Sequence, residues 1–173
     1  VPEIARLTGA KVIGPKAVTR FLERRNHIDK DQLITIAAGQ TIAFPDFEVA
    51  AFAWKHRDVN LIRSISKATL KGNFTQLAWA WHSATQAPFA APYTGYRITL
   101  PDGMTILNYN EGFNSKMTDA EIEELGQSCH TNILLGGMQL NFTEDVHRGV
   151  KALDPYMILL YPPHDKLHAM MGI

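Results

Sequence analysis

The spacing of apolar positions predicts short strands and helices over the first third of the chain. Residues 2–8 are predicted to form a helix that ends at Gly9, and Pro15 opens a second helix through about Arg25. Strands are predicted where apolar runs lie between turn residues, at positions 11–14, 33–36, 41–44 and 47–54. A strand, a helix and then consecutive strands indicate a mixed α/β fold.

The rest of the chain continues in the same way after a helical stretch. Apolar positions repeat at helical spacing over about residues 59–81. Asp102-Gly103 between two apolar runs predicts a β-hairpin, and Thr118-Asp-Ala-Glu121 is a capping box that begins a helix. A strand, a helix and a last strand are then predicted at 132–136, 142–153 and 156–161.

Composition and charge exclude several classes of protein. The 173 residues are 46% hydrophobic, which suits a single domain with its own core over residues 1–173. Lysine plus arginine equals aspartate plus glutamate at 17 each, so no basic surface for nucleic acid is expected. Because no apolar run approaches the ~18 residues of a membrane span, none is expected. The single cysteine, Cys129, excludes an intramolecular disulfide and favours a reducing, cytoplasmic compartment.

Three polar clusters directly follow predicted apolar strands. They are His56-Arg57-Asp58, Asn108-Tyr-Asn-Glu111-Gly112 and His164-Asp165-Lys166. Imidazole and carboxylate groups that are held rigidly at strand ends are the donors that a divalent ion needs. One histidine after a strand is more often a hydrogen-bonded surface residue. Three clusters in the same structural position favour a metal site.

The order of these elements resembles the metallo-β-lactamase superfamily, and within it the branch of ascorbate-phosphate lactonase and similar metal-dependent hydrolases. Residues 4–15 and 37–40 resemble the passage that follows the first metal motif of that branch. Residues 47–56 resemble the strand that ends in its third-motif histidine. Residues 105–112 stand where the family has an apolar strand followed by Gly-Asp-Thr-Gly, and residues 157–164 resemble its last strand and metal-binding histidine.

This resemblance implies an α/β fold that forms the later part of an αββα sandwich, with a helical insertion at about residues 59–83. It implies three metal ligands, with His82 as the alternative to the first of them: His56, Glu111 and His164. Three further residues would orient these ligands without contacting the metal themselves, namely Asp58, Asp165 and His168. Residues that would line a pocket for an apolar part of the substrate are Trp81, Phe89 and Tyr93, although a tryptophan in the insertion is more often a packing residue.

The activity that the resemblance implies is hydrolysis of an ester, lactone or phosphoester in a small-molecule substrate by a metal-bound hydroxide. One or two divalent ions are expected. Histidine and carboxylate ligands suit zinc, the expected ion, and also accept manganese or iron. No membrane or nucleic-acid partner is expected, and the inserted helices offer a contact surface for a homo-oligomer.

Two departures from the family pattern support a second interpretation. The family's most diagnostic motif, His-x-His-x-Asp-His, does not occur in the sequence, and the resemblance places it N-terminal to Val1. Glu111 stands where the family has a bridging aspartate, and its extra methylene moves the carboxylate by about one carbon–carbon bond length. The alternative is therefore a catalytically inactive member that keeps the fold as an interaction or structural module.

Overall fold

The computed structural model describes residues 1–26, 28–56, 78, 81, 91–110, 114–128, 130–137 and 143–161. The chain divides into two compact units. The first contains Val1–Ala38 together with the described residues between 60 and 94, and the second contains the described residues of Gly39–Val59 and Gly95–Ile173.

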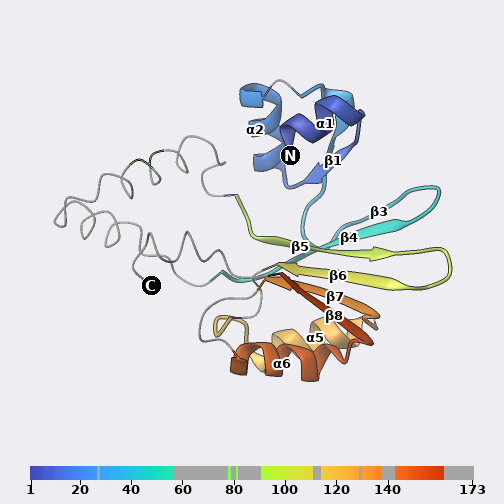
Figure 1. Cartoon of the computed structure of the whole chain (residues 1–173), viewed down its shortest axis with the longest axis vertical. Helices are drawn as coiled ribbons and strands as arrows, with labels where there is room; N and C mark the ends of the chain where they lie inside the picture. The colour runs from blue at the N-terminus through green and yellow to red at the C-terminus, as the bar shows by residue number, and fades with distance from the viewer. Residues whose placement is uncertain are drawn as a thin grey trace. The chain divides into compact units, whose positions relative to one another are not determined.

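The first unit is a small β-α-β arrangement preceded by a helix (Figure 1). Its elements are α1 (Pro2–Thr8), β1 (Val12–Gly14), α2 (Lys16–Asn26), the short 3₁₀ helix η1 (Lys30–Gln32) and β2 (Leu33–Thr35). Strands β1 and β2 pair in parallel, and α2 connects them. The predicted helices and strands of this region are confirmed, while η1 was not predicted.

Local residue chemistry explains where the elements of the first unit begin and end. Gly9 adopts a left-handed φ of 69°, and its amide donates to the Ala5 carbonyl to close α1. Buried Ala5, Leu22 and Ile28 form the core of the unit. The Gln32 side chain also donates to the Ala5 carbonyl at 2.8 Å, which ties η1 to α1.

The second unit is built on a six-stranded mixed sheet in the order β3-β4-β5-β6-β7-β8 (Figure 1). The strands are β3 (Thr41–Ala43), β4 (Glu48–Ala53), β5 (Thr94–Thr99), β6 (Thr105–Asn110), β7 (Ile133–Gly137) and β8 (Met157–Tyr161). β3 and β4 are antiparallel, as are β5 and β6, whereas β6, β7 and β8 are parallel to one another. The predicted hairpin is confirmed, with Gly103 at a φ of 84° in its turn.

Two helices connect the three parallel strands and cover one face of the sheet (Figure 1). They are α5 (Asp119–Ser128) and α6 (Thr143–Leu153). The predicted capping box begins α5, since the Thr118 amide donates to Glu121 Oε2 at 2.9 Å and the Glu121 amide donates back to Thr118 Oγ1 at 3.3 Å. A Cβ at Gly126 would strike the Ala152 carbonyl oxygen, so this glycine lets the two helices approach closely.

The core of the second unit lies between the sheet and these helices. It consists of Trp54, Leu107, Tyr109, Met117, Ile122, Leu134 and Leu153. The predicted helical insertion falls outside the described residues except for Ala78 and Trp81, which are both helical. Within the described ranges, no helix has the length and apolar content that crossing a membrane requires.

Candidate metal centre

The strands that precede the three predicted polar clusters end on the same side of the sheet. β6, β7 and β8 are parallel, so their carboxyl ends lie together. β4 runs in the same direction as β6 (Figure 1). The Asn114 side-chain amide, shortly after β6, donates to the carbonyl of Lys55, shortly after β4, at 2.8 Å. We call this side the carboxyl end of the sheet.

Of the three predicted ligands, the structure describes His56, which lies three residues beyond the end of β4. Its ring contacts the indole of Trp54, with 5.7 Å between the ring centroids and 48° between the planes. The Trp54 side chain belongs to the core and is only 8% exposed, whereas His56 is half-buried. Trp54 therefore anchors the imidazole to the carboxyl end of the sheet.

β6 carries an irregularity directly before the predicted ligand Glu111. Its register against β7 shifts between Asn108 and Asn110, which leaves Tyr109 as the bulged residue. Tyr109 is fully buried, and burial raises the pKa of its phenol well above the ordinary value. Bulges are common next to functional sites because they redirect the side chains that follow.

An aromatic contact joins β4 to β6 across the intervening strand β5. The Phe52 and Tyr109 rings stack with centroids 6.3 Å apart and planes at 21°. Phe52 reaches over β5 because the residue beneath its ring is Gly95, where a Cβ would collide with that ring. A residue without a side chain in the middle strand thus permits contact between next-nearest strands.

A polar network joins the same two strands beyond their ends. Besides accepting the Asn114 hydrogen bond, Lys55 donates its amide to Met117 Sδ at 3.3 Å, and its ammonium pairs with Glu121 Oε1 at 2.5 Å. The Lys55 ammonium, helped by the amide and hydroxyl of Thr118, lowers the pKa of Glu121 to about 2. We call Lys55, Asn114, Met117 and Glu121 the strand-end tie.

Arg148 on α6 supports the strand-end tie from the helix layer. Its guanidinium donates to the Met117 carbonyl at 2.8 Å, to Asp119 at 2.6 Å and to Asp145 at 3.0 Å. The pKa of Arg148 is raised, chiefly by the hydrogen bond with Asp119. One arginine therefore fixes the start of α5, and the loop before it, against α6.

The other predicted site residues are only partly covered by the structure. Those outside the described residues are Asp58, His82, Phe89, Glu111, His164, Asp165 and His168. Trp81 and Tyr93, predicted to line a substrate pocket, belong to the first unit and are 74% and 51% exposed. Within the described ranges, no three His, Cys, Asp or Glu side chains are grouped to hold a metal. The ligand set and the pocket remain predictions.

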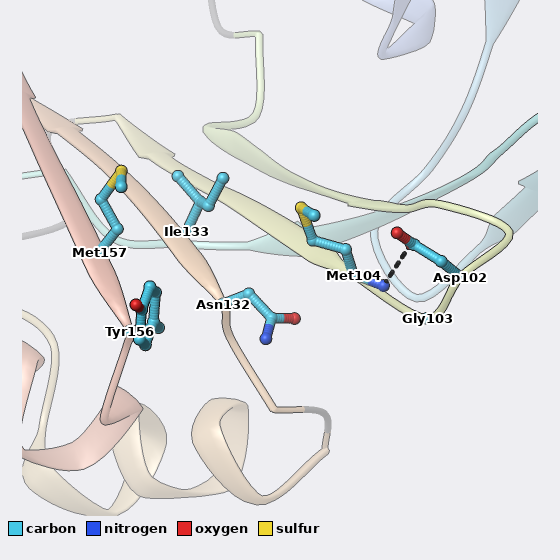
Figure 2. Close-up of a pocket in the computed structure, with 7 residues that line it drawn as sticks. All are labelled: Asp102, Gly103, Met104, Asn132, Ile133, Tyr156 and Met157. Carbon is cyan, nitrogen blue, oxygen red and sulfur yellow. Dashed lines mark hydrogen bonds between the residues drawn. The ribbon is translucent and has the colours of Figure 1, made fainter.

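A cavity of about 420 Å³ lies at the opposite, amino end of the sheet (Figure 2). It is lined by Asp102, Gly103, Met104, Asn132, Ile133, Tyr156 and Met157. Two of its polar side chains bond to the backbone, since Asp102 Oδ1 accepts the Met104 amide at 2.9 Å and Asn132 Oδ1 accepts the Thr105 amide at 2.8 Å. This cavity has no imidazole in its lining, and it lies at the end of the sheet opposite to His56.

Sequence reasoning did not identify the residues that organise the carboxyl end. Asn114, Tyr109, Phe52, Gly95 and Arg148 act through contacts between segments far apart in the chain. An asparagine shortly after a strand is usual in a loop, and a glycine in a strand only suggests a close approach. No local pattern names their partners.

Comparison with known proteins adds information about the fold. No family's sequence profile matches the chain, and no curated protein matches it in sequence. In structure, the chain is similar to CmlA, a diiron β-hydroxylase from Streptomyces venezuelae, with a TM-score of 0.54. CmlA has the metallo-β-lactamase fold. The predicted fold class is confirmed.

The similarity covers different shares of the two chains. The match covers 94% of this chain and 35% of CmlA, at 12% sequence identity. The chain thus spans about a third of the length of that protein, and so low an identity concerns the fold alone. The ascorbate-phosphate lactonase branch remains a prediction from the sequence.

Proposed function

We propose that this chain supplies ligands to the metal site of a metal-dependent hydrolase, at the carboxyl end of its sheet. The observation that supports this most strongly is the hydrogen bond between Asn114 and the Lys55 carbonyl. It joins the segment that carries His56 to the segment that follows Glu111. The metallo-β-lactamase fold, in which CmlA is a diiron enzyme, adds support for a metal.

The residues at this end of the sheet fit a divalent ion by their donor chemistry. His56 offers an imidazole nitrogen held against Trp54, Glu111 a carboxylate after the β6 bulge, and His164 a second imidazole after β8. Asp58 or Asp165 would accept a hydrogen bond from a ligand imidazole and so fix its orientation, and His168 would lie behind them.

When bound, a divalent ion supplies Lewis acidity, which lowers the pKa of a water molecule and polarises the substrate oxygen. The protein's task is to hold donors, exclude bulk water and bind substrate. Trp54 and Tyr109 belong to the hydrophobic core of the second unit, and Phe52 packs against it. The proposed substrate is an ester, lactone or phosphoester. Zinc is the proposed ion.

A second candidate function is iron-dependent hydroxylation. It is favoured by the structural similarity to CmlA, a diiron β-hydroxylase, and by Glu111, since carboxylates are common ligands of iron. The two reactions differ in their co-reactants, because hydroxylation needs dioxygen and two electrons whereas hydrolysis needs only water. Metal identity and oxygen consumption therefore distinguish them.

Metal analysis of the full-length protein tests the proposal. His56→Ala and His164→Ala are each expected to lose most of the bound metal. His147→Ala, at an exposed position on α6, is the control and should keep it. Full metal occupancy in His164→Ala would remove that residue from the ligand set. Metal binding without turnover of any ester, lactone or phosphoester, and without oxygen uptake, would favour the inactive module.

A further inference from the structure

We infer that Asn114 is a positioning residue of the metal site, because its side chain fixes the segment that carries His56 relative to the segment that follows Glu111. The inference rests on the proposed function and adds a residue outside the proposed ligand set. Neither the sequence pattern nor the similarity to CmlA points to this asparagine. It follows from hydrogen bonds within the second unit.

Both ends of the Asn114 amide are engaged. Its Nδ2 donates to the Lys55 carbonyl at 2.8 Å, and its Oδ1 accepts the Lys116 amide at 2.9 Å. The residue is only 5% exposed. A buried planar amide bonded at both ends cannot rotate without leaving a polar group unsatisfied, so its orientation is strongly fixed.

The two segments that Asn114 joins are short. Lys55 directly precedes His56, and Asn114 follows Glu111 by three residues. β6 ends at Asn110, and the buried hydrogen bond is made by Asn114, four residues later in the sequence. We expect the separation of metal ligands on these two segments to depend on this bond. Residues that orient metal ligands in this way often matter for affinity almost as much as the ligands.

The other links in the strand-end tie are weaker or more exposed. The Lys55 amide meets a thioether sulfur, which is a weak acceptor. The ion pair between Lys55 and Glu121 involves side chains that are 54% and 35% exposed, where water screens the attraction. Asn114 therefore provides the strong buried polar connection of the tie.

A titration of the metal-free full-length protein with Co²⁺ tests this role, because the visible absorption of bound Co²⁺ reports the arrangement of its ligands. Asn114→Ala is expected to bind Co²⁺ about 10- to 100-fold more weakly than the wild type, with shifted absorption bands. A residue that contributes only to folding would not change the spectrum of the bound ion. Thermal melting of each variant confirms that the titrations are made on folded protein.

Asn132→Ala is the matched control at the amino end of the sheet. Asn132 Oδ1 accepts two hydrogen bonds from Thr105, from the amide at 2.8 Å and from the hydroxyl at 3.1 Å. This variant should lose thermal stability as Asn114→Ala does, yet bind Co²⁺ with wild-type affinity and spectrum. If it weakens Co²⁺ binding as much, the loss in Asn114→Ala is a general effect of destabilisation and the inference is wrong.

Asn114→Asp gives a sharper test, and serves if Asn114→Ala does not fold. It keeps an oxygen for the Lys116 amide but, when ionised, cannot donate to the Lys55 carbonyl. The added negative charge should by itself strengthen the binding of a cation. Weaker Co²⁺ binding would therefore be due to the loss of the hydrogen bond to the Lys55 carbonyl. Wild-type binding by both Asn114 variants would overturn the inference and leave the proposed function intact. If the His56→Ala variant binds Co²⁺ as the wild type does, the proposed function is wrong, and the inference with it.

Discussion

The two ends of the six-stranded sheet use the same kind of polar contact with different consequences. At the amino end, Asn132 bonds to Thr105 and thereby ties the starts of β6 and β7 beside an open cavity. At the carboxyl end, the hydrogen bond from Asn114 to Lys55 joins the segments after β4 and β6, and His56 is the residue after Lys55. Both asparagines secure the chain, but only the second holds a segment with a proposed metal ligand. Two similar hydrogen bonds can thus differ in their importance for function, because only one of them holds a segment that carries a proposed ligand.

The largest effect is expected when the buried aromatic contact at the carboxyl end is removed. Tyr109→Ala deletes a fully buried side chain and leaves a cavity in the core, which should lower the free energy of unfolding by about 3–5 kcal/mol. Urea denaturation measures the loss. Tyr156→Ala, which is 87% exposed at the amino end, should change this free energy by no more than about 0.5 kcal/mol. Similar losses in both variants would contradict the assignment of the core.

Gly95→Ala should disturb the same contact by a different mechanism. The new Cβ would collide with the Phe52 ring and displace it from Tyr109, at an expected loss of about 1–3 kcal/mol in the free energy of unfolding. A double-mutant cycle supplies the control. In a Phe52→Ala background the collision is absent, so Gly95→Ala should then have little effect. If Gly95→Ala still lowers the free energy of unfolding in that background, the collision with Phe52 is not the cause of the loss.

The two asparagines should be close to equivalent in stability. Asn114→Ala removes the hydrogen bonds with Lys55 and Lys116, and Asn132→Ala removes those with the amide and hydroxyl of Thr105, so each should lower the free energy of unfolding by about 1–3 kcal/mol. Chemical denaturation of the metal-free protein measures both. A much larger loss for Asn114→Ala would weaken the comparison between the two ends, since its effect on metal binding would then not be separable from its effect on folding.

The local parts of this fold could be predicted from the sequence. Gly9 ends a helix because it tolerates a left-handed backbone, and the Thr118 capping box begins one because it satisfies free amides. The turn around Gly103 follows from the same preferences. Each of these features is decided by residues a few positions apart, so the pattern of the chain is sufficient.

The organisation of the candidate site could not be predicted in the same way. The bond from Asn114 to Lys55 spans 59 positions in the sequence, and the Phe52–Tyr109 contact depends on which strand lies between them. The bulge at Tyr109 depends on its pairing with β7. The sequence indicated three polar clusters after strands, and the strand order then placed the ends of those strands on one side of the sheet.

The smallest effect concerns the exposed part of the strand-end tie and depends on pH. The pKa of Glu121 is about 2 in the folded protein against an ordinary value of 4.5, so ionised Glu121 stabilises the fold. This contribution is fully present above pH 4.5 and disappears as the pH falls towards 2. Wild type should therefore melt above Glu121→Gln at neutral pH, and the difference should vanish in acid. Glu124→Gln, an exposed change on the same helix, corrects for the general effect of charge.

The most direct test of the account is to locate the metal by anomalous X-ray diffraction from crystals of the full-length protein. A fluorescence scan first identifies the element, and a difference map at its absorption edge then gives its position. We expect a peak at the carboxyl end of β4, β6 and β8, within coordination distance of a His56 ring nitrogen. A peak beside the cavity at the amino end, or fully incorporated metal that His56 does not contact, would contradict the account.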